Sequence, residues 1–125
     1  MNVMVDSFAW MEFFKGTERG KKVLNILHDE DNRIYTTVAN YYELYYRLTQ
    51  EQGPSKRDEA LAFIKDRSRL MDITEEVARG AAEIRLIEGL SAIDAFTLAA
   101  ARLVGGKVLT GGRDFDKFKD EIIKI

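Results

Sequence analysis

Apolar runs and amphipathic stretches alternate along the whole chain, and the two patterns predict different elements. Short runs that are apolar on both faces are typical of buried strands, whereas apolar positions three and four residues apart indicate helices. The predicted strands cover residues 2–5, 33–37, 70–73, 107–110 and 122–125. The predicted helices cover residues 7–14, 18–30, 38–53, 55–67, 75–89 and 92–106, with a helical turn at 114–121.

Polar residues at the helix starts support these boundaries. Thr17, Ser55, Thr74 and Ser91 each stand where an N-cap is expected, and Gly53-Pro54 is a strong stop signal. Strands that alternate with helices are typical of α/β proteins. We therefore predict an α/β fold, a parallel sheet of four to five short strands covered by helices on both faces. The chain has no internal repeat or linker, so residues 1–125 are expected to form one domain.

Composition removes several kinds of chemistry. The chain has no cysteine and a single histidine, His28, which excludes disulfides, thiolate metal sites, cysteine nucleophiles and histidine clusters. The net charge is −2, so nucleic-acid binding would need a local basic patch. The apolar stretch at residues 2–14 is too short to span a membrane and lacks the leading basic residues of a signal peptide. We expect a cytoplasmic protein with no membrane contact.

Three acidic residues stand where an α/β protein places a ligand site, and a fourth acid is notable for its aromatic neighbours. Asp6 follows the first predicted strand, Asp114 follows the fourth, and Asp94 lies in the first turn of a largely apolar helix. Glu43 lies inside an aromatic run of another helix. Ligands of open α/β sheets bind outside the carboxyl ends of the strands. These four carboxylates therefore form a candidate site.

Each acid also has a purely structural interpretation. Asp6 and Asp114 can each cap the helical segment that follows, and Asp94 stands at capping-box spacing from Ser91. Glu43 can pair with Arg47 one helical turn away. As a group, however, the acids repel one another and raise each other's pKa, which favours a bound cation. Without cysteine or a histidine cluster, a hard cation such as Mg²⁺ or Mn²⁺ is the natural partner.

The sequence resembles the PIN-domain ribonucleases, and among them the VapC-type toxins of toxin–antitoxin pairs. The resemblance rests on four stretches in the family's order: "VMVDSFAWMEFF", "YELYYRL", "SAIDAFTLAAARLVGGKVLTGGRDF" and the last short strand. It covers essentially the whole chain and implies a PIN-like nuclease domain that cleaves RNA with Mg²⁺ or Mn²⁺. It also implies an antitoxin partner, which lays a helical segment into a groove near the active site, and a homodimer.

The resemblance assigns roles residue by residue. It implies that Asp6, Glu43 and Asp94 are the primary catalytic and metal-binding acids, that Asp114 is a fourth, and that Ser7 and Thr110 support them. The family's last motif usually reads Thr-x-Asp-x-Asp-Phe, and here Gly112 replaces the first acid. One expected carboxylate is therefore missing. A catalytically weakened PIN-fold module that binds RNA or protein is the alternative function.

Two further expectations concern binding surfaces. Arg47 and Arg113 lie beside the acids Glu43 and Asp114 and are candidates for contact with RNA phosphates, although each can instead pair with its neighbouring acid. The first helix is apolar on almost every side, which predicts a partner groove that includes Trp10. Phosphoryl transfer onto Asp6 is a third, disfavoured activity, because no second acid follows at Asp-x-Asp spacing.

Overall fold

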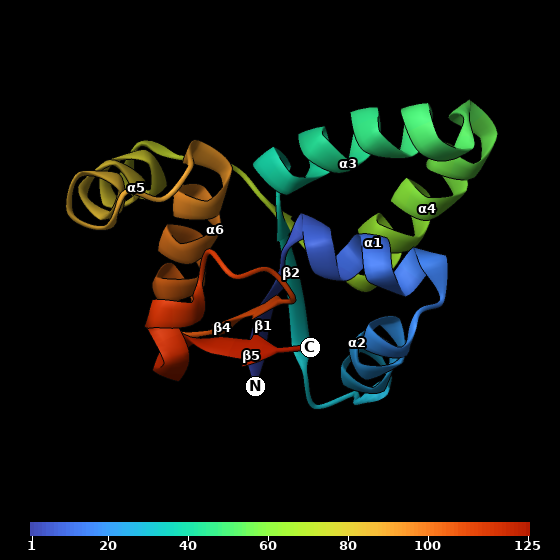
Figure 1. The fold of residues 1–125 in the computed structure, drawn as a ribbon, viewed down its shortest axis with the longest axis horizontal. Helices are drawn as coiled ribbons and strands as arrows, with labels where there is room; N and C mark the ends of the chain where they lie inside the picture. Colours follow the sequence, from blue (N-terminus) through green and yellow to red (C-terminus); the bar gives the residue numbers. More distant parts are fainter.

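The computed structural model describes all 125 residues and places a parallel sheet at the centre of the molecule, with helices on both faces (Figure 1). Its strands are β1 (Asn2–Val5), β2 (Arg33–Thr37), β3 (Arg69–Met71), β4 (Lys107–Thr110) and β5 (Ile122–Lys124). They lie in the order β3-β2-β1-β4-β5, and every neighbouring pair is parallel. The predicted α/β fold is confirmed.

Six α-helices and one short 3₁₀ segment connect the strands. The helices are α1 (Ser7–Lys15), α2 (Glu18–His28), α3 (Val38–Gln52), α4 (Pro54–Arg67), α5 (Glu75–Glu88) and α6 (Ala92–Leu103). A 3₁₀ segment, η1 (Asp116–Glu121), leads into β5. None of these helices is long and apolar enough to cross a membrane.

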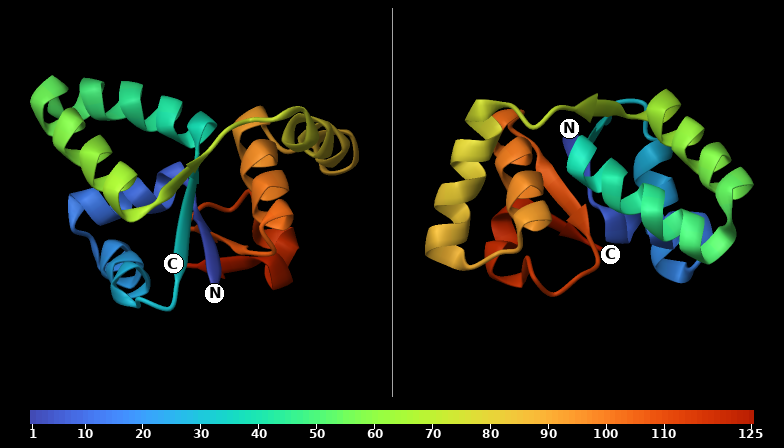
Figure 2. Two further views of the ribbon diagram at one scale, coloured as in Figure 1. Left: turned by 180° about the vertical axis from the view of Figure 1, so that it is seen from behind. Right: turned by 90° about the horizontal axis from the view of Figure 1, so that it is seen from above.

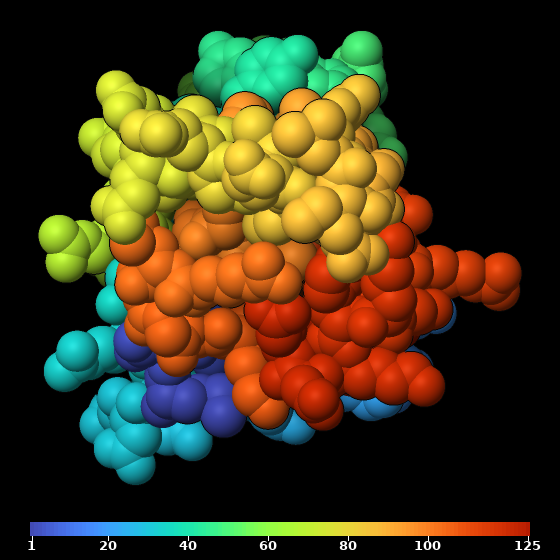
Figure 3. All heavy atoms as spheres, turned by 90° about the vertical axis from the view of Figure 1, so that its left-hand side faces the viewer, coloured from blue at the N-terminus to red at the C-terminus, as the bar shows by residue number.

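Each face of the sheet is buried under its own set of helices, and the views from behind and from above both show the two sets on opposite sides of the sheet (Figure 2). Successive residues of β1 alternate between the faces: Val3 and Val5 pack with α1 to α4, whereas Met4 packs with α5 and α6. All three are fully buried. On the second face, α5 lies alongside the outer side of α6 (Figure 3). This two-sided burial explains why the strands are apolar throughout.

Most predicted boundaries agree with the structure to within two residues, with three corrections. The sixth helix was predicted to reach residue 106 but ends at Leu103, because Gly105 adopts a left-handed φ of 63°. Ser55 was predicted to cap the fourth helix, but α4 begins at Pro54 with Gly53 in the cap position and no side-chain cap. Proline suits the first helical position because its φ is already helical and the N–H it lacks would have no partner there. The third strand covers Arg69–Met71 instead of residues 70–73, because its pairing with β2 begins at Arg69 opposite Tyr35.

The position of β1 determines where a site can form. The chain runs from β1 outward through β2 to β3, then returns to place β4 and β5 on the other side of β1. The strand order therefore changes direction between β1 and β4. The carboxyl ends of these two strands meet there, and the amide of Asp6 donates a hydrogen bond to the carbonyl of Leu109 over 3.2 Å. Open α/β sheets bind ligands at such switch points.

Candidate functional site

A small pocket of about 110 Å³ lies at this switch point, and it is lined by residues from four segments of the chain. All four predicted acids contribute to its wall, together with the predicted supporting residues and Arg47. The lining residues are Asp6, Ser7, Phe8, Asn40, Glu43, Arg47, Asp94, Thr110, Gly112, Asp114 and Phe115. The fold thus brings Asp6 and Asp114, from opposite ends of the chain, to the same pocket.

Asp6 is the most buried of the acids, with 5% of its surface exposed. It is the N-cap of α1, and one of its carboxylate oxygens accepts a hydrogen bond from the amide of Ala9 over 2.8 Å. Burial raises the pKa of Asp6 to about 7, although hydrogen bonds from Thr110 and Ala9 oppose the rise and the charges of Asp94 and Glu43 add to it. The capping and site interpretations of Asp6 are therefore compatible.

Asp94 lies in the first turn of α6, where the Ser91 side chain is the N-cap. Desolvation raises the pKa of Asp94 to about 6, a hydrogen bond with Ser91 lowers it, and the nearby carboxyls of Asp114 and Glu43 raise it further. Asp114 is exposed and follows β4, and its carboxyl is close enough to Asp94 to raise the pKa of that residue. The pKa shifts of Asp6 and Asp94 thus both include the charges of neighbouring acids among their causes, and these acids come from four different segments.

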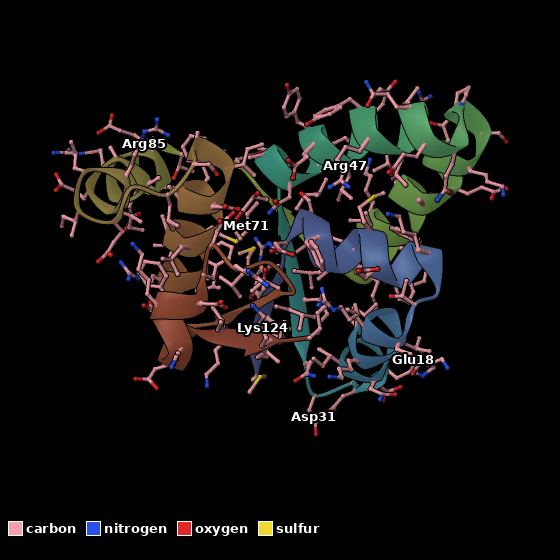
Figure 4. The ribbon with its side chains drawn as sticks, in the orientation of Figure 1. Glu18, Asp31, Arg47, Met71, Arg85 and Lys124 are labelled. Atoms are coloured by element: carbon pink, nitrogen blue, oxygen red, sulfur yellow. The ribbon has the colours of Figure 1, made fainter.

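The two arginines differ in their relation to the pocket. Arg47 lies on the side of α3 that faces α1 and lines the pocket beside Glu43 (Figure 4). Arg113 is exposed and is not part of the lining. Neither arginine forms an ion pair with any carboxylate, so the proposed pairings with Glu43 and Asp114 are absent. Both guanidinium groups therefore remain free to contact an anion.

The loop after β4 is fixed from two sides. The hydroxyl of Thr110 accepts a hydrogen bond from the amide of Gly112 over 3.2 Å, and Nζ of Lys124 donates to the Gly112 carbonyl and to Asp116, each over 2.6 Å. Lys124 stands on the last strand, beside this loop (Figure 4). Sequence reasoning missed Lys124, because its partners become neighbours only when β5 joins the sheet.

The donor set suits a hard divalent cation, because carboxylate oxygens are the ligands that such ions prefer. Burial of mutually repelling carboxylates is also the condition that a cation relieves. As they stand, however, no three acidic or histidine side chains are close enough together to enclose a metal ion. The four acids line an open pocket whose chemistry fits a cation, and the carboxylates would have to approach one another to coordinate it.

Asn40 and Thr97 are buried polar residues of this region that sequence reasoning also missed. Asn40 lines the pocket, and its side chain is bonded to Ser7 and Thr97. Asn40 stands three residues before Glu43 and Thr97 three residues after Asp94. A polar residue one helical turn from each acid, on an otherwise apolar helix face, was the available signal.

The surface of α1 differs from the prediction. Trp10 is fully buried, and its indole N–H donates a hydrogen bond to the Thr36 hydroxyl over 3.0 Å, so Trp10 belongs to the core and does not line a groove. The reason is that α1 packs against several neighbours at once, namely α2, α3 and β4. Phe13 and Phe14 are only partly buried. Phe13 stacks with Phe63 of α4, which is 41% exposed, and Phe14 meets the same ring edge-on.

Comparisons with known proteins agree with this architecture. The toxin–antitoxin complex from Klebsiella pneumoniae is similar, with a TM-score of 0.78 and 19% identity over 98% of this chain and 99% of that one. VapBC2 from Rickettsia felis, bound to a promoter DNA fragment, has a TM-score of 0.77 and 15% identity over 99% and 98% of the two chains.

A third similar structure is VapC20 from Mycobacterium tuberculosis, a toxin that cleaves the sarcin–ricin loop. Its TM-score is 0.77, with 17% identity over 98% of both chains. At these identities the likenesses establish the fold alone. A comparison with curated protein sequences gave no match. Residues 3–121, nearly the whole chain, match the PIN domain family, and the protein belongs to that family.

Proposed function

We propose that this protein is a Mg²⁺- or Mn²⁺-dependent endoribonuclease, the toxin of a VapBC-type toxin–antitoxin pair. The observation that carries the proposal is the pocket of four carboxylates at the switch point of a PIN fold. PIN domains are generally nucleases that use divalent metal ions. The similar VapC20 is a toxin that cleaves the sarcin–ricin loop, which supports RNA as the class of substrate.

In this proposal the acids hold the cation. Asp6, Glu43 and Asp94 are the primary ligands, and Asp114 is the fourth carboxylate. A divalent cation in such a site supplies an activated water and neutralises charge on the phosphodiester that is cleaved. Thr110 and the Ala9 amide hold the Asp6 carboxylate by hydrogen bonds, and the free guanidinium of Arg47 contacts a phosphate of the RNA. Arg113 is a second phosphate contact further from the pocket.

A titration of Mn²⁺ into the purified chain, with a structured RNA as substrate, tests this function. Cleavage should require the cation and should be lost on chelation. Asp94→Asn is the informative variant, because it removes one charge with almost no change in shape. It should abolish cleavage and preserve the fold. Metal-independent cleavage, or full activity in Asp94→Asn, would refute the proposal.

Gly112 favours a second candidate, a PIN-fold module that binds RNA or protein and cleaves weakly. The position that usually supplies an acid has no side chain here. The two candidates differ in one measurement. A binding module retains RNA in a filter or gel-shift assay while saturating Mn²⁺ produces no cleavage, whereas the nuclease consumes its substrate under the same conditions.

The proposed partners are an antitoxin and a second copy of the chain. Similar proteins are found in toxin–antitoxin complexes. Phe13, Phe14 and Phe63 form a partly exposed aromatic ridge between two hollows of about 510 and 410 Å³, and this ridge is the proposed antitoxin surface. Exposed apolar patches of this kind mark protein interfaces. Sedimentation at micromolar concentration tests the homodimer, since a species of 14.3 kDa would be a monomer.

A further inference from the structure

The three primary acids come from three separate elements, and one chain of side-chain hydrogen bonds joins those elements. The hydroxyl of Ser7, at the start of α1, donates to Oδ1 of Asn40 on α3 over 2.9 Å. Nδ2 of Asn40 donates to the hydroxyl of Thr97 on α6 over 3.0 Å. Asn40 therefore connects α3 to α1 and α6, through partners that lie 33 residues before it and 57 residues after it in the sequence.

The directions of these bonds follow from their partners. The Thr97 hydroxyl donates its only proton to the carbonyl of Ile93, over 2.8 Å, so it can only accept from Asn40. The amide group of Asn40 must then face Thr97 with its nitrogen and Ser7 with its oxygen. Every member of the network has a partner, and no buried side-chain nitrogen or oxygen in the molecule lacks one.

The network is buried and lies next to each acid. Ser7 is 3% exposed, Asn40 1% and Thr97 0%. Ser7 adjoins Asp6 in the sequence, while Asn40 and Thr97 stand one helical turn from Glu43 and Asp94. A buried polar group without a hydrogen bond is costly, so a shift of one helix against another would leave one of these groups unpaired.

We propose that Asn40 is the positioning residue of the site: through Ser7 and Thr97 it holds the backbone segments that carry Asp6, Glu43 and Asp94 in one relative placement, from which the three carboxylates can turn toward a divalent cation. This inference rests on the proposed function of the pocket. Both ends of the Asn40 amide are occupied within the protein, so Asn40 acts through the acids and is not itself a catalytic residue. Hydrogen-bonded partners of metal ligands have this orienting role in known metal sites.

Substitutions at Thr97 separate positioning from simple packing. Thr97→Val keeps the shape of the side chain but removes the hydroxyl that accepts from Asn40, whereas Thr97→Ser keeps the hydroxyl and loses a methyl group. Mn²⁺ binding is measured by calorimetry on the metal-free chain without RNA. We expect Thr97→Val to weaken Mn²⁺ binding by roughly tenfold or more, as for other orienting partners. Because Thr97→Ser keeps the hydroxyl, its affinity for Mn²⁺ should remain within about threefold of the wild-type affinity.

A matched control accounts for lost stability. Val23 lies on α2, is fully buried and does not line the pocket or belong to the hydrogen-bond network, so Val23→Ala destabilises the fold while every group of the network stays in place. Mn²⁺ affinity in Val23→Ala should equal that of wild type below its unfolding transition. If Thr97→Val loses stability like Val23→Ala but keeps wild-type affinity, the network only supports packing and the proposal is overturned.

Ser7→Ala breaks the other end of the network and provides a second variant if Thr97→Val does not fold. Because both substitutions act through Asn40, their effects on Mn²⁺ affinity should be non-additive in a double-mutant cycle. Additive effects would contradict a shared positioning role.

The proposed metal-dependent function can fail while the positioning role of Asn40 still holds, and the two outcomes can be told apart. If the wild-type chain binds no Mn²⁺, the crystal structures of wild type and Ser7→Ala decide the matter. Displacement of Glu43 relative to Asp6 and Asp94 in the variant would then support the positioning role without a metal. Unchanged acid positions would overturn it.

Discussion

The first and the later turns of helix α1 both contribute buried residues, yet they are built from opposite kinds of residue. The first turn carries Asp6 and Ser7, which are polar, lie at the pocket and depend on hydrogen bonds. The later turns carry Trp10 and Phe13, whose rings are 5.9 Å apart in an edge-on arrangement. One helix thus joins the candidate site to the largest aromatic cluster of the molecule.

This contrast shows where stability comes from and where it is lost. Burial of apolar area stabilises the fold at about 25 cal/mol per Å². Burial of a carboxylate does the reverse, as the pKa of Asp6, raised to about 7, indicates. The aromatic end of α1 therefore offsets the cost of the polar end. Substitution of an aromatic residue of α1 should therefore destabilise the fold, whereas removal of the Asp6 charge should stabilise the fold and impair the site.

The largest effect is expected from Trp10→Ala. The substitution removes a fully buried ring and its hydrogen bond to Thr36, so the free energy of unfolding should fall by about 3–5 kcal/mol. Urea unfolding followed by circular dichroism measures the loss. Phe63→Ala is the matched control, because Phe63 belongs to the same cluster but is 41% exposed. A loss as large in Phe63→Ala would mean that the two rings are equally part of the core.

Asp6→Asn is expected to change the free energy of unfolding in the opposite direction, so that the variant is more stable than wild type. The pKa of Asp6 is about 7 in the folded chain and 3.8 without the fold. Between these values the folded state holds a proton that the unfolded state has lost, so stability falls as the pH rises from about 4 to about 7 and is level above. Asparagine cannot ionise and is an equally good N-cap. At pH 7.5 without metal, Asp6→Asn should therefore be more stable than wild type, by up to about 4 kcal/mol.

Urea unfolding between pH 4 and pH 8 tests this expectation. The difference between the two chains should grow across the range and then stop growing. Asp66→Asn, an exposed position on α4, controls for the loss of a charge elsewhere. Parallel pH curves for wild type and Asp6→Asn would contradict the burial argument. Mn²⁺ should reverse the order, because it stabilises only a chain that retains the carboxylate.

The same contrast explains what the sequence could and could not predict. Strands and helices follow from local periodicity, and Asp6 and Asp114 could be placed at one edge of the sheet because parallel strands share one carboxyl edge. The position of Trp10 could not be derived, since an apolar helix surface does not reveal how many neighbours cover it. The role of Asn40 was hidden for a related reason. Its partners, Ser7 and Thr97, are distant in the sequence and become neighbours only in the folded chain.

The loop that carries Asp114 contains two adjacent glycines, one tightly packed and one beside open space, and substitutions there should have smaller effects on stability. A Cβ atom on Gly111 would collide with Cε1 of the Phe8 ring and lie 2.7 Å from Cδ1, whereas one on Gly112 would meet nothing closer than the Thr110 hydroxyl at 3.8 Å. Gly111→Ala should therefore cost about 1–3 kcal/mol, the usual range for overpacking. Gly112→Ala should stay within about 0.5 kcal/mol of wild type. Equal losses in the two variants would show that Phe8 can move aside.

The smallest effect on stability is expected from Gly112→Asp, which restores the acid that the family usually has. Gly112 does not have a positive φ, and the space beside it is open, so the new side chain can be accommodated. The added carboxylate should tighten Mn²⁺ binding by roughly three- to tenfold, because affinity for hard cations rises with the number of charged ligands. Gly112→Asn has the same shape without the charge and should leave the affinity unchanged. Calorimetry on the two variants decides between a site that lacks a ligand and one that Asp114 already completes. If Gly112→Asp binds Mn²⁺ no better than Gly112→Asn, the fourth carboxylate is sufficient, and the glycine serves only the path of the loop over Phe8.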